Sequence, residues 1–320
     1  MRKPTLSVIM GNYNDGCYIT EALEAILSQS WPPAEVIVID DGSTDRSVEV
    51  IEELARKHDV IKFHRNDENR GVIFSYARAL EIASGDYVYI ACANDKVLPG
   101  FFEKTMNLLS RYPQAGLCHT ELRAFDGREY RSYLSGQPRY FAPEELTAKL
   151  KRHGYFYAGG MNSVIRRDAL LQSGGFIPQT GPLCDLFATM VVSSRHGLCY
   201  IPEPLVAIRI VKDSYSGAVK RRGAPMRRLL KDILILLDTP AYRDLSQWIE
   251  RTGVWPTLFP SMLYVLLKNR ARWRYLSPGL VQRALWVGMR NAVGRIVPLA
   301  GKKCYSRVAN RFRRLAIAFD

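Results

Sequence analysis

The first 92 residues alternate between short apolar runs and segments whose apolar side chains recur at helical spacing. Runs rich in β-branched and other apolar residues predict four strands, at residues 6–10, 35–40, 60–64 and 86–92. Apolar residues three or four positions apart predict three intervening helices, at residues 19–27, 48–55 and 73–83. Because parallel strands need such crossover helices, the order predicts an α/β fold with a doubly wound, mostly parallel sheet.

Polar residues, many of them Asn or Asp, follow all four predicted strands. The segments are Gly11-Asn12-Tyr13-Asn14, Asp40-Asp41-Gly42-Ser43, Asn69-Arg70-Gly71 and Ala93-Asn94-Asp95. Ligands of doubly wound sheets bind at the carboxyl ends of the strands, so these segments predict a ligand site. Turns also favour Asn and Asp for local reasons, but four strand ends with the same chemistry are hard to explain in that way.

Several common functional classes lack their motifs in this chain. No G-x-G-x-x-G follows the first predicted strand and no G-x-x-x-x-G-K-[ST] occurs, so the dinucleotide fingerprint and the P-loop are both absent. The six cysteines form no C-x-x-C pair, and the five histidines show no H-x-x-x-H spacing. We therefore expect reduced, mostly buried thiols and no zinc site.

The remainder of the chain is less regular. Residues 116–120, 163–167 and 197–202 are predicted strands, and helices are predicted from residue 142 and over residues 186–195. Beyond residue 225 the apolar spacing is helical, at residues 229–237, 258–267 and 280–297. We expect the C-terminal third to be mainly helical.

The net charge of +14 is concentrated in that C-terminal third. Residues 220–320 hold 21 Lys or Arg and 5 Asp or Glu, a net charge of +16, whereas residues 1–219 have a net charge of −2. We predict a ligand-binding domain at 1–219 and a basic helical region at 220–320. Such a region is typical of proteins that bind a polyanion, either nucleic acid or an anionic membrane. Its cations alternate with Leu, Trp and Tyr, which suits a membrane surface at least as well, and nucleic acid is the less expected partner.

Two features bear on cellular location. No apolar run reaches the eighteen or so residues that a membrane-spanning helix needs. The segment Met1-Arg2-Lys3-Pro4-Thr5 leads directly into a predicted strand, without the apolar stretch and cleavage site of a signal peptide. We expect a cytoplasmic protein, with peripheral attachment to the inner face of the cell membrane as a further hypothesis.

Five segments resemble the family 2 glycosyltransferases, which have the GT-A fold. They are Ser7-Val8-Ile9-Met10-Gly11-Asn12-Tyr13-Asn14, Asp40-Asp41-Gly42-Ser43-Thr44-Asp45, Asn69-Arg70-Gly71, Ser84-Gly85-Asp86-Tyr87 and Ile201-Pro202-Glu203-Pro204-Leu205. The resemblance covers roughly residues 4–210, and D-D-G-S-T-D is its most specific part. It implies an inverting transfer of a sugar from a nucleotide diphosphate to a hydroxyl of a surface glycan or its lipid-linked precursor.

Two of the matching residues suit a uracil base. The ring of Tyr13 could stack on the flat base, although an aromatic residue at a strand end can also belong to the core. Asp41 could accept the ring N–H of uracil, although an acid at a helix N-terminus is also stabilised by the helix dipole. Asp40 could take that role instead, but the resemblance favours Asp41. Tyr13 and Asp41 together indicate a UDP-sugar donor.

The other nucleotide-site candidates follow the first and third strands. The resemblance places Gly11 and Asn69 at the nucleotide. Arg70 and Arg78 are candidates for contacting the diphosphate through paired donors, although many relatives carry this arginine at the position of Tyr76. Both arginines could also be solvated helix residues.

The family's D-x-D metal motif is altered in this chain. The corresponding stretch is Cys92-Ala93-Asn94, followed by Asp95, so both family aspartates are replaced. A divalent cation stabilises the charge of a departing diphosphate. Asn94 and Asp95 still offer oxygen ligands, so the resemblance implies a Mg²⁺ or Mn²⁺ site that is weaker than one with two carboxylates. A plain turn before Pro99 is the alternative.

An inverting transfer also needs a base for the acceptor's proton. Family members place an acid after a G-G-F turn, and here Gly174-Gly175-Phe176 is followed by Asp185 at a suitable distance. The resemblance therefore implies that Asp185 is the catalytic base. Because Asp185 heads an apolar helix, a helix N-cap is the alternative role, and both can hold at once.

Two other functional classes remain open. A nucleotidyltransferase on a similar sheet would need a glycine-rich, basic loop directly after the first strand, which residues 11–14 do not resemble. A non-catalytic scaffold that binds a glycan or a nucleotide sugar is favoured by the altered D-x-D motif.

Overall fold

The computed structural model describes most of the chain. The described residues are 2–131, 134, 136–153, 158–210, 223–254, 259–278, 280–281 and 284–285. The chain divides into two units, Met1–Thr257 and Leu258–Asp320.

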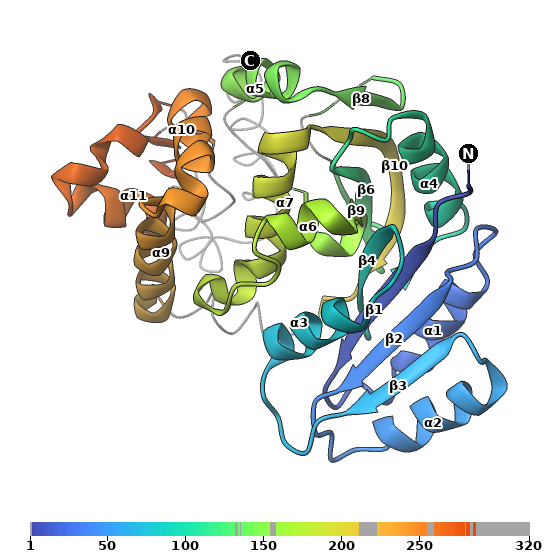
Figure 1. Cartoon of the computed structure of the whole chain (residues 1–320). Coiled ribbons are helices and arrows are strands. Elements are labelled where there is room, and N and C mark those ends of the chain that lie inside the picture. Colours follow the sequence, from blue (N-terminus) through green and yellow to red (C-terminus); the bar gives the residue numbers. More distant parts are fainter. Residues whose placement is uncertain are drawn as a thin grey trace, which may run out of the picture. The chain divides into compact units, whose positions relative to one another are not determined.

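The first unit is built on one sheet, whose described part has ten strands (Figure 1). The strands are β1 Leu6–Asn12, β2 Glu35–Asp40, β3 Ile61–Arg65, β4 Tyr87–Cys92, β5 Lys96–Val97, β6 Leu117–Ala124, β7 Glu129–Tyr130, β8 Arg139–Phe141, β9 Ser163–Arg166 and β10 Leu198–Ile208. Their order across the sheet is β3-β2-β1-β4-β9-β6-β10-β5, with β7 paired to β6 and β8 paired to β10. Strands β1 to β4 are parallel, and β9 lies antiparallel between β4 and β6. The predicted mostly parallel α/β sheet is thus confirmed.

Helices cover both faces of this sheet (Figure 1). They are α1 Ile19–Leu27, α2 Ser47–Lys57, α3 Val72–Ile82, α4 Phe101–Arg111, α5 Pro143–His153, α6 Arg167–Gln172 and α7 Cys184–His196, with the 3-10 turns η1 Gly160–Asn162 and η2 Pro178–Leu183. Helices α9 Gly223–Leu237 and α10 Arg243–Thr252, with the 3-10 turn η3 Pro240–Tyr242, make their main contacts with η2, α5 and α7. Side chains alternate along β1, as they must in a strand. Val8 and Met10 share one core cluster with α1, α2 and α4, whereas Gly11 faces Val72 of α3.

The strand register brings the predicted polar segments to one edge of the sheet. β1 lies between β2 and β4, with Asn12 opposite Asp40 and Gly11 opposite Cys92. Because these strands are parallel, the residues that follow them all leave the sheet at its carboxyl edge. The candidate site is therefore set by the pairing of three strands.

At the amino ends of the parallel strands, Glu35, the first residue of β2, connects β1 and the segment before β4 through hydrogen bonds. Its carboxylate is 2% exposed and accepts hydrogen bonds from Ser7 Oγ at 2.7 Å and from the Ser84 N–H at 2.7 Å, and it pairs with Lys62. The N–H of Gly85 donates to Ser7 Oγ at 2.8 Å, and a Cβ on Gly85 would lie 2.7 Å from the Ser7 backbone nitrogen. The Ser84-Gly85-Asp86 segment therefore joins β1 to β4 and has a structural role.

We predict that Glu35→Gln lowers the free energy of unfolding by about 1.5–3 kcal/mol at pH 7, because Gln loses the charge that these buried donors bind. Burial would raise the pKa of the Glu35 carboxyl, but hydrogen bonds from Lys62, Ser7 and Ser84 outweigh it and lower the pKa to about 2. The stabilisation is therefore complete above about pH 4.5 and is lost as the pH falls toward 2. Urea unfolding at pH 7 and pH 3 measures both effects.

The control for this experiment is Glu53→Gln, on the exposed face of α2. Glu53 pairs with Lys57 at 2.6 Å, and both side chains are solvent-exposed, so the urea midpoint should stay unchanged. A Glu35→Gln variant with the wild-type midpoint at pH 7 would contradict the structural role of Glu35.

Three helices, α4, α6 and α10, were not predicted from the sequence. In α4, Phe101, Phe102, Thr105 and Met106 are buried at helical spacing, so the sequence does carry a signal for this helix. In α10, most residues are polar and only a narrow stripe is buried. Helix α10 contacts α5 and α7. Its buried stripe therefore depends on tertiary packing, which the local sequence does not show.

The step in charge at residue 220 does not coincide with the boundary between the units, which falls after Thr257. Helix α10 is tied to the rest of its unit, since Trp248 Nε1 donates to Thr147 Oγ1 at 3.0 Å and Asp244 pairs with Arg195 at 2.6 Å. Helix α9 contacts η2, where Leu229 lies against Gly181. The apolar faces of α9 and α10 are buried within the first unit. The cations of these helices contribute to the step in charge at residue 220, but this step does not mark the boundary between the units.

The unit Leu258–Asp320 contains helix α11 Phe259–Leu267 and the 3-10 turn η4 Arg270–Tyr275, which contact each other. Most of the predicted helix at 280–297 lies outside the described residues. Among the residues that are described, no helix combines the length and the apolar character needed to cross a bilayer.

Candidate active site

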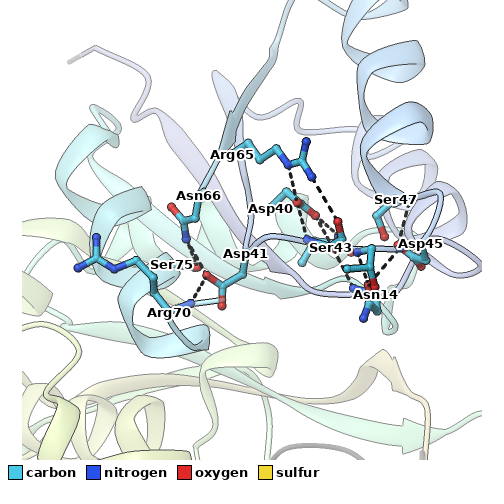
Figure 2. Close-up of polar contacts among 12 residues, drawn as sticks. Asn14, Asp40, Asp41, Ser43, Asp45, Ser47, Arg65, Asn66, Arg70 and Ser75 are labelled. Atoms are coloured by element: carbon cyan, nitrogen blue, oxygen red, sulfur yellow. Dashed lines mark hydrogen bonds and ion pairs between the residues drawn. The ribbon is translucent and has the colours of Figure 1, made fainter. Parts of the chain in front are cut away.

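The adjacent acids Asp40 and Asp41 point in different directions and have different partners (Figure 2). Asp40 is fully buried, and its carboxylate accepts from Asn12 Nδ2 at 2.8 Å and from Ser43 Oγ at 2.5 Å and N–H at 3.0 Å. Arg65 Nε lies 3.7 Å from it. Asp40 therefore joins the ends of β1 and β2 to the following turn, and its oxygens are used within the protein.

Asp41 is turned toward the Asn69-Arg70-Gly71 segment (Figure 2). Its carboxylate is 3% exposed and accepts from Asn66 Nδ2 at 2.7 Å, from the Arg70 N–H at 3.0 Å and from the Gly71 N–H at 2.8 Å. An ionised carboxylate has about four acceptor positions, so three bonds leave one for a ligand. Asp41 thus shapes the turn before α3 and keeps capacity for one more donor.

The structure places Arg78 behind this turn. Its Nη1 donates to Asn66 Oδ1 at 2.6 Å and to the Arg65 carbonyl at 3.1 Å. Because Asn66 in turn donates to Asp41, Arg78 orients a side chain that orients the acid. This chain from Arg78 through Asn66 to Asp41 was not predicted, since no sequence pattern singles out Asn66.

The other third-strand candidates lie on the exposed turn. The Arg70 guanidinium lies 3.6 Å from the ring centroid of Phe74. Asn69 is exposed, and its Oδ1 accepts from the Gly71 N–H at 3.1 Å. Both residues border the turn that Asp41 holds.

Asn14 positions the loop after β1. It has a positive φ of 56°, and its Oδ1 accepts from the Thr44 N–H at 2.8 Å, while its own N–H donates to Ser43 Oγ at 2.9 Å. These bonds fasten the loop to the D-D-G-S-T-D turn. The neighbouring Tyr13 is 45% exposed, so its ring is available to a ligand, and Gly11 leads into this loop beside α3.

At the end of β4, Asp95 is bound to the segment that follows β10. Its Oδ1 accepts from the Arg209 N–H at 2.7 Å, and Arg209 Nε donates to the Asn94 carbonyl at 3.2 Å. Burial raises the pKa of the Asp95 carboxyl to about 6, although the Arg209 N–H opposes the rise. Burial likewise raises the pKa of the neighbouring Cys92 thiol well above its usual value.

This donor set does not fit a divalent cation. Mg²⁺ and Mn²⁺ are held mainly by carboxylate oxygens in a near-octahedral shell. Here Ala93 separates a thiol from an amide, Asp95 carries the one carboxylate within residues 92–95, and its Oδ1 already accepts from the Arg209 N–H. In the described part of the chain, no three His, Cys, Asp or Glu side chains gather as a metal site. The oxygen ligands that we expected from Asn94 and Asp95 are therefore too few.

Asp185 lies in the first turn of α7, two residues after the N-cap Leu183, so it is not the N-cap. Its Oδ2 accepts from the Gly160 N–H at 2.8 Å, and the side chain is partly exposed. Its charge adds to the effect of burial in raising the pKa of Tyr76 and of Cys92. Asp185 therefore lies near the end of β4, beside the strand ends that carry the nucleotide candidates.

Comparisons with known proteins show the family of this chain. The family model "Glycosyl transferase family 2" matches residues 7–174, and the chain belongs to this family. One relative is the putative teichuronic acid biosynthesis glycosyltransferase TuaG of Bacillus subtilis, 31% identical over 146 residues, which are 45% of this chain and 56% of TuaG. The chain spans only about half of the length of several curated relatives. In two further relatives, the matched segment is 44% and 45% of the relative's length.

Solved structures share the fold. TarS 1-349 of S. aureus, determined in complex with UDP-GlcNAc, superposes with a TM-score of 0.61 at 16% identity, covering 82% of this chain and 79% of TarS 1-349. The mannosyltransferase PcManGT of Pyrobaculum calidifontis, in complex with GDP-Man and Mn²⁺, has a TM-score of 0.56 at 18% identity, covering 92% and 81%. At these identities the likeness shows the GT-A fold alone.

Proposed function

We propose that this glycosyltransferase is an inverting enzyme that moves a sugar from a UDP-sugar to a hydroxyl of a glycan or lipid-linked acceptor. The observation that carries the proposal is the position of two acids near one edge of the sheet. Asp41 holds the turn before α3, and its N–H donates to the carbonyl of Asn12, the neighbour of the exposed Tyr13. Asp185 lies near the end of β4, since a Cβ on Gly160 would meet both Ile90 and Asp185. These positions support a role for Asp41 at the nucleotide and for Asp185 at the acceptor.

The reaction is a single displacement. As the acceptor oxygen forms its bond to the anomeric carbon, the bond from that carbon to the diphosphate breaks, and the nucleoside diphosphate leaves with the electron pair. Asp185 takes the acceptor's proton, which makes the oxygen a better nucleophile. The Gly160 N–H orients the Asp185 carboxylate before it accepts that proton.

The choice of UDP rests on Asp41 and Tyr13. The remaining acceptor position of Asp41 suits the N–H of uracil, and the exposed Tyr13 ring suits stacking on the base. TarS was determined with UDP-GlcNAc, which supports a uridine nucleotide on this fold, whereas PcManGT was determined with GDP-Man. The roles of Gly11, Asn69, Arg70 and Arg78 at the nucleotide stay predictions.

Support for surface-glycan synthesis comes from TuaG, whose name places it in teichuronic acid biosynthesis. The simplest test of the whole proposal is an assay for nucleoside diphosphate release from a panel of UDP- and GDP-sugars, with and without Mn²⁺. Turnover with inversion at the anomeric carbon supports the enzyme. Tight binding without any turnover supports a non-catalytic scaffold, which the altered D-x-D motif favours as the second candidate.

The charge that develops on the diphosphate needs a cation. PcManGT was determined with Mn²⁺, but the donors at Asn94 and Asp95 of this chain do not fit a divalent ion. The donor set at the end of β4 favours an arginine of this chain instead.

We also propose that residues 220–320 hold the enzyme at the inner membrane surface. In η4, Arg270, Arg272 and Arg274 alternate with Trp273, which is about half exposed, as is Tyr264 of α11. Cations attract an anionic leaflet, and exposed aromatic rings enter the interface.

Replacing all three η4 arginines with Gln should weaken binding to anionic vesicles roughly tenfold or more, because each cation near such a surface contributes about 1 kcal/mol. Co-sedimentation at rising salt measures this. A control removes three cations from α2, by Arg46→Gln, Arg56→Gln and Lys57→Gln. Equal binding to neutral and anionic vesicles, or equal effects of the two triple variants, would contradict the membrane hypothesis.

A further inference from the structure

We propose that Arg209 supplies, in place of a divalent metal ion, the positive charge that neutralises the donor's diphosphate. This inference rests on the proposed glycosyl transfer. It concerns the cation that faces the diphosphate. The resemblance to the family implies that this cation is a metal ion, but the donor set of Cys92, Asn94 and Asp95 does not fit a metal ion.

Arg209 lies at the turn where the family's metal motif is altered. It follows β10 directly, and its backbone N–H donates to Asp95 Oδ1 at 2.7 Å. Its Nε donates to the Asn94 carbonyl at 3.2 Å. Backbone and side chain are therefore both attached to the turn, so the guanidinium occupies a defined position beside the end of β4.

The guanidinium is held in that position by three further contacts. It lies 4.5 Å from the ring centroid of Tyr18 and 4.1 Å from that of Phe125, and its Nη2 pairs with Glu21 at 2.9 Å. Planar guanidinium groups stack on aromatic rings, and such contacts fix their orientation. A charge fixed before the substrate binds needs little reorganisation when charge develops during the reaction.

Arg209 keeps binding capacity for a ligand. Its side chain is 26% exposed, and in the part of the chain that the structure describes its Nη1 donates no hydrogen bond. Glu21 also pairs with Lys96 at 3.1 Å, so this carboxylate is shared between two cations. The Nη1 donors are therefore available to phosphate oxygens, which guanidinium groups bind through paired N–H groups.

The decisive experiment compares binding of a nucleoside diphosphate and of its monophosphate by calorimetry in excess EDTA, with UDP or GDP, whichever binds more tightly. Wild type should bind the diphosphate without metal. Arg209→Gln should weaken diphosphate binding about tenfold to a hundredfold, with little effect on the monophosphate. Arg209→Lys should recover part of the lost affinity, because Lys keeps the positive charge but lacks the paired N–H groups of the guanidinium.

The matched control is Lys96→Gln, which removes a cation from the same carboxylate, Glu21. It should change diphosphate affinity less than threefold, and thermal unfolding checks that every variant is folded. Diphosphate binding that requires Mn²⁺, an Arg209→Gln variant with wild-type affinity, or equal losses in Arg209→Gln and Lys96→Gln would each overturn the inference. A wild type that binds neither UDP nor GDP, with or without Mn²⁺, would instead contradict the proposed function itself.

Discussion

Asp185→Asn is expected to lower kcat by roughly 10²–10⁴ while donor binding persists. Asn cannot take the acceptor's proton, but its amide oxygen can still accept from the Gly160 N–H, so the local structure should be kept. The measurement is single-turnover kinetics with a saturating donor, so that the chemical step is observed. Donor affinity, measured in parallel by calorimetry, should stay close to that of wild type.

A matched control is available in Asp168→Asn. Asp168 also lies in the first turn of a helix, α6, where it pairs with Arg166 at 2.7 Å. This variant should keep near-normal turnover, because Asp168 is assigned no part in the reaction. If Asp185→Asn keeps more than a tenth of the wild-type rate when chemistry is rate-limiting, Asp185 is not the base.

Asp41→Asn should weaken UDP binding about tenfold to a hundredfold, because one charge-assisted hydrogen bond to the base is lost. Selectivity is the sharper readout. Uracil offers an N–H where cytosine offers a bare ring nitrogen, so the carboxylate should favour UDP over CDP. Competition calorimetry with UDP and CDP should show that this preference disappears in Asp41→Asn.

The control must separate base recognition from the shape of the turn, since Asp41 also accepts from Asn66, Arg70 and Gly71. Asn66→Ala removes one of these donors but leaves the carboxylate. It should cost stability and some affinity, yet keep the preference for UDP. If both variants lose the preference equally, Asp41 acts through the turn and does not read the base.

The alternating N-terminal segments were predictable because each is long, apolar and bounded by turns. The sheet order after β4 was not predicted in detail, since β9 lies between β4 and β6 although it follows both in sequence. The pairing of distant strands depends on packing, which local periodicity does not report. Likewise, no pattern marks Arg209, because its importance comes from meeting Asp95 across more than a hundred residues of chain.

The location of the site was predictable from the sequence, but the hydrogen-bond partners of its residues were less so. Asp41 and Tyr13 lie at the strand ends where we expected a ligand. Arg78, a candidate for the diphosphate, donates to Asn66 Oδ1 and to the Arg65 carbonyl. A sequence shows which residues carry charge, whereas the partner of each charge depends on side-chain geometry.

The contact between Leu229 and Gly181 limits how far the chain can be truncated from its C-terminus before we expect activity to be lost. Gly181 has a positive φ of 51° in η2, four residues before Asp185, and a Cβ there would lie 3.0 Å from Leu229 Cδ1. Cutting the chain where its charge changes, at residue 219, would keep every strand of the sheet. It would also remove Leu229, which packs against Gly181 shortly before Asp185, the proposed base, so we expect a working fragment to extend at least through α9.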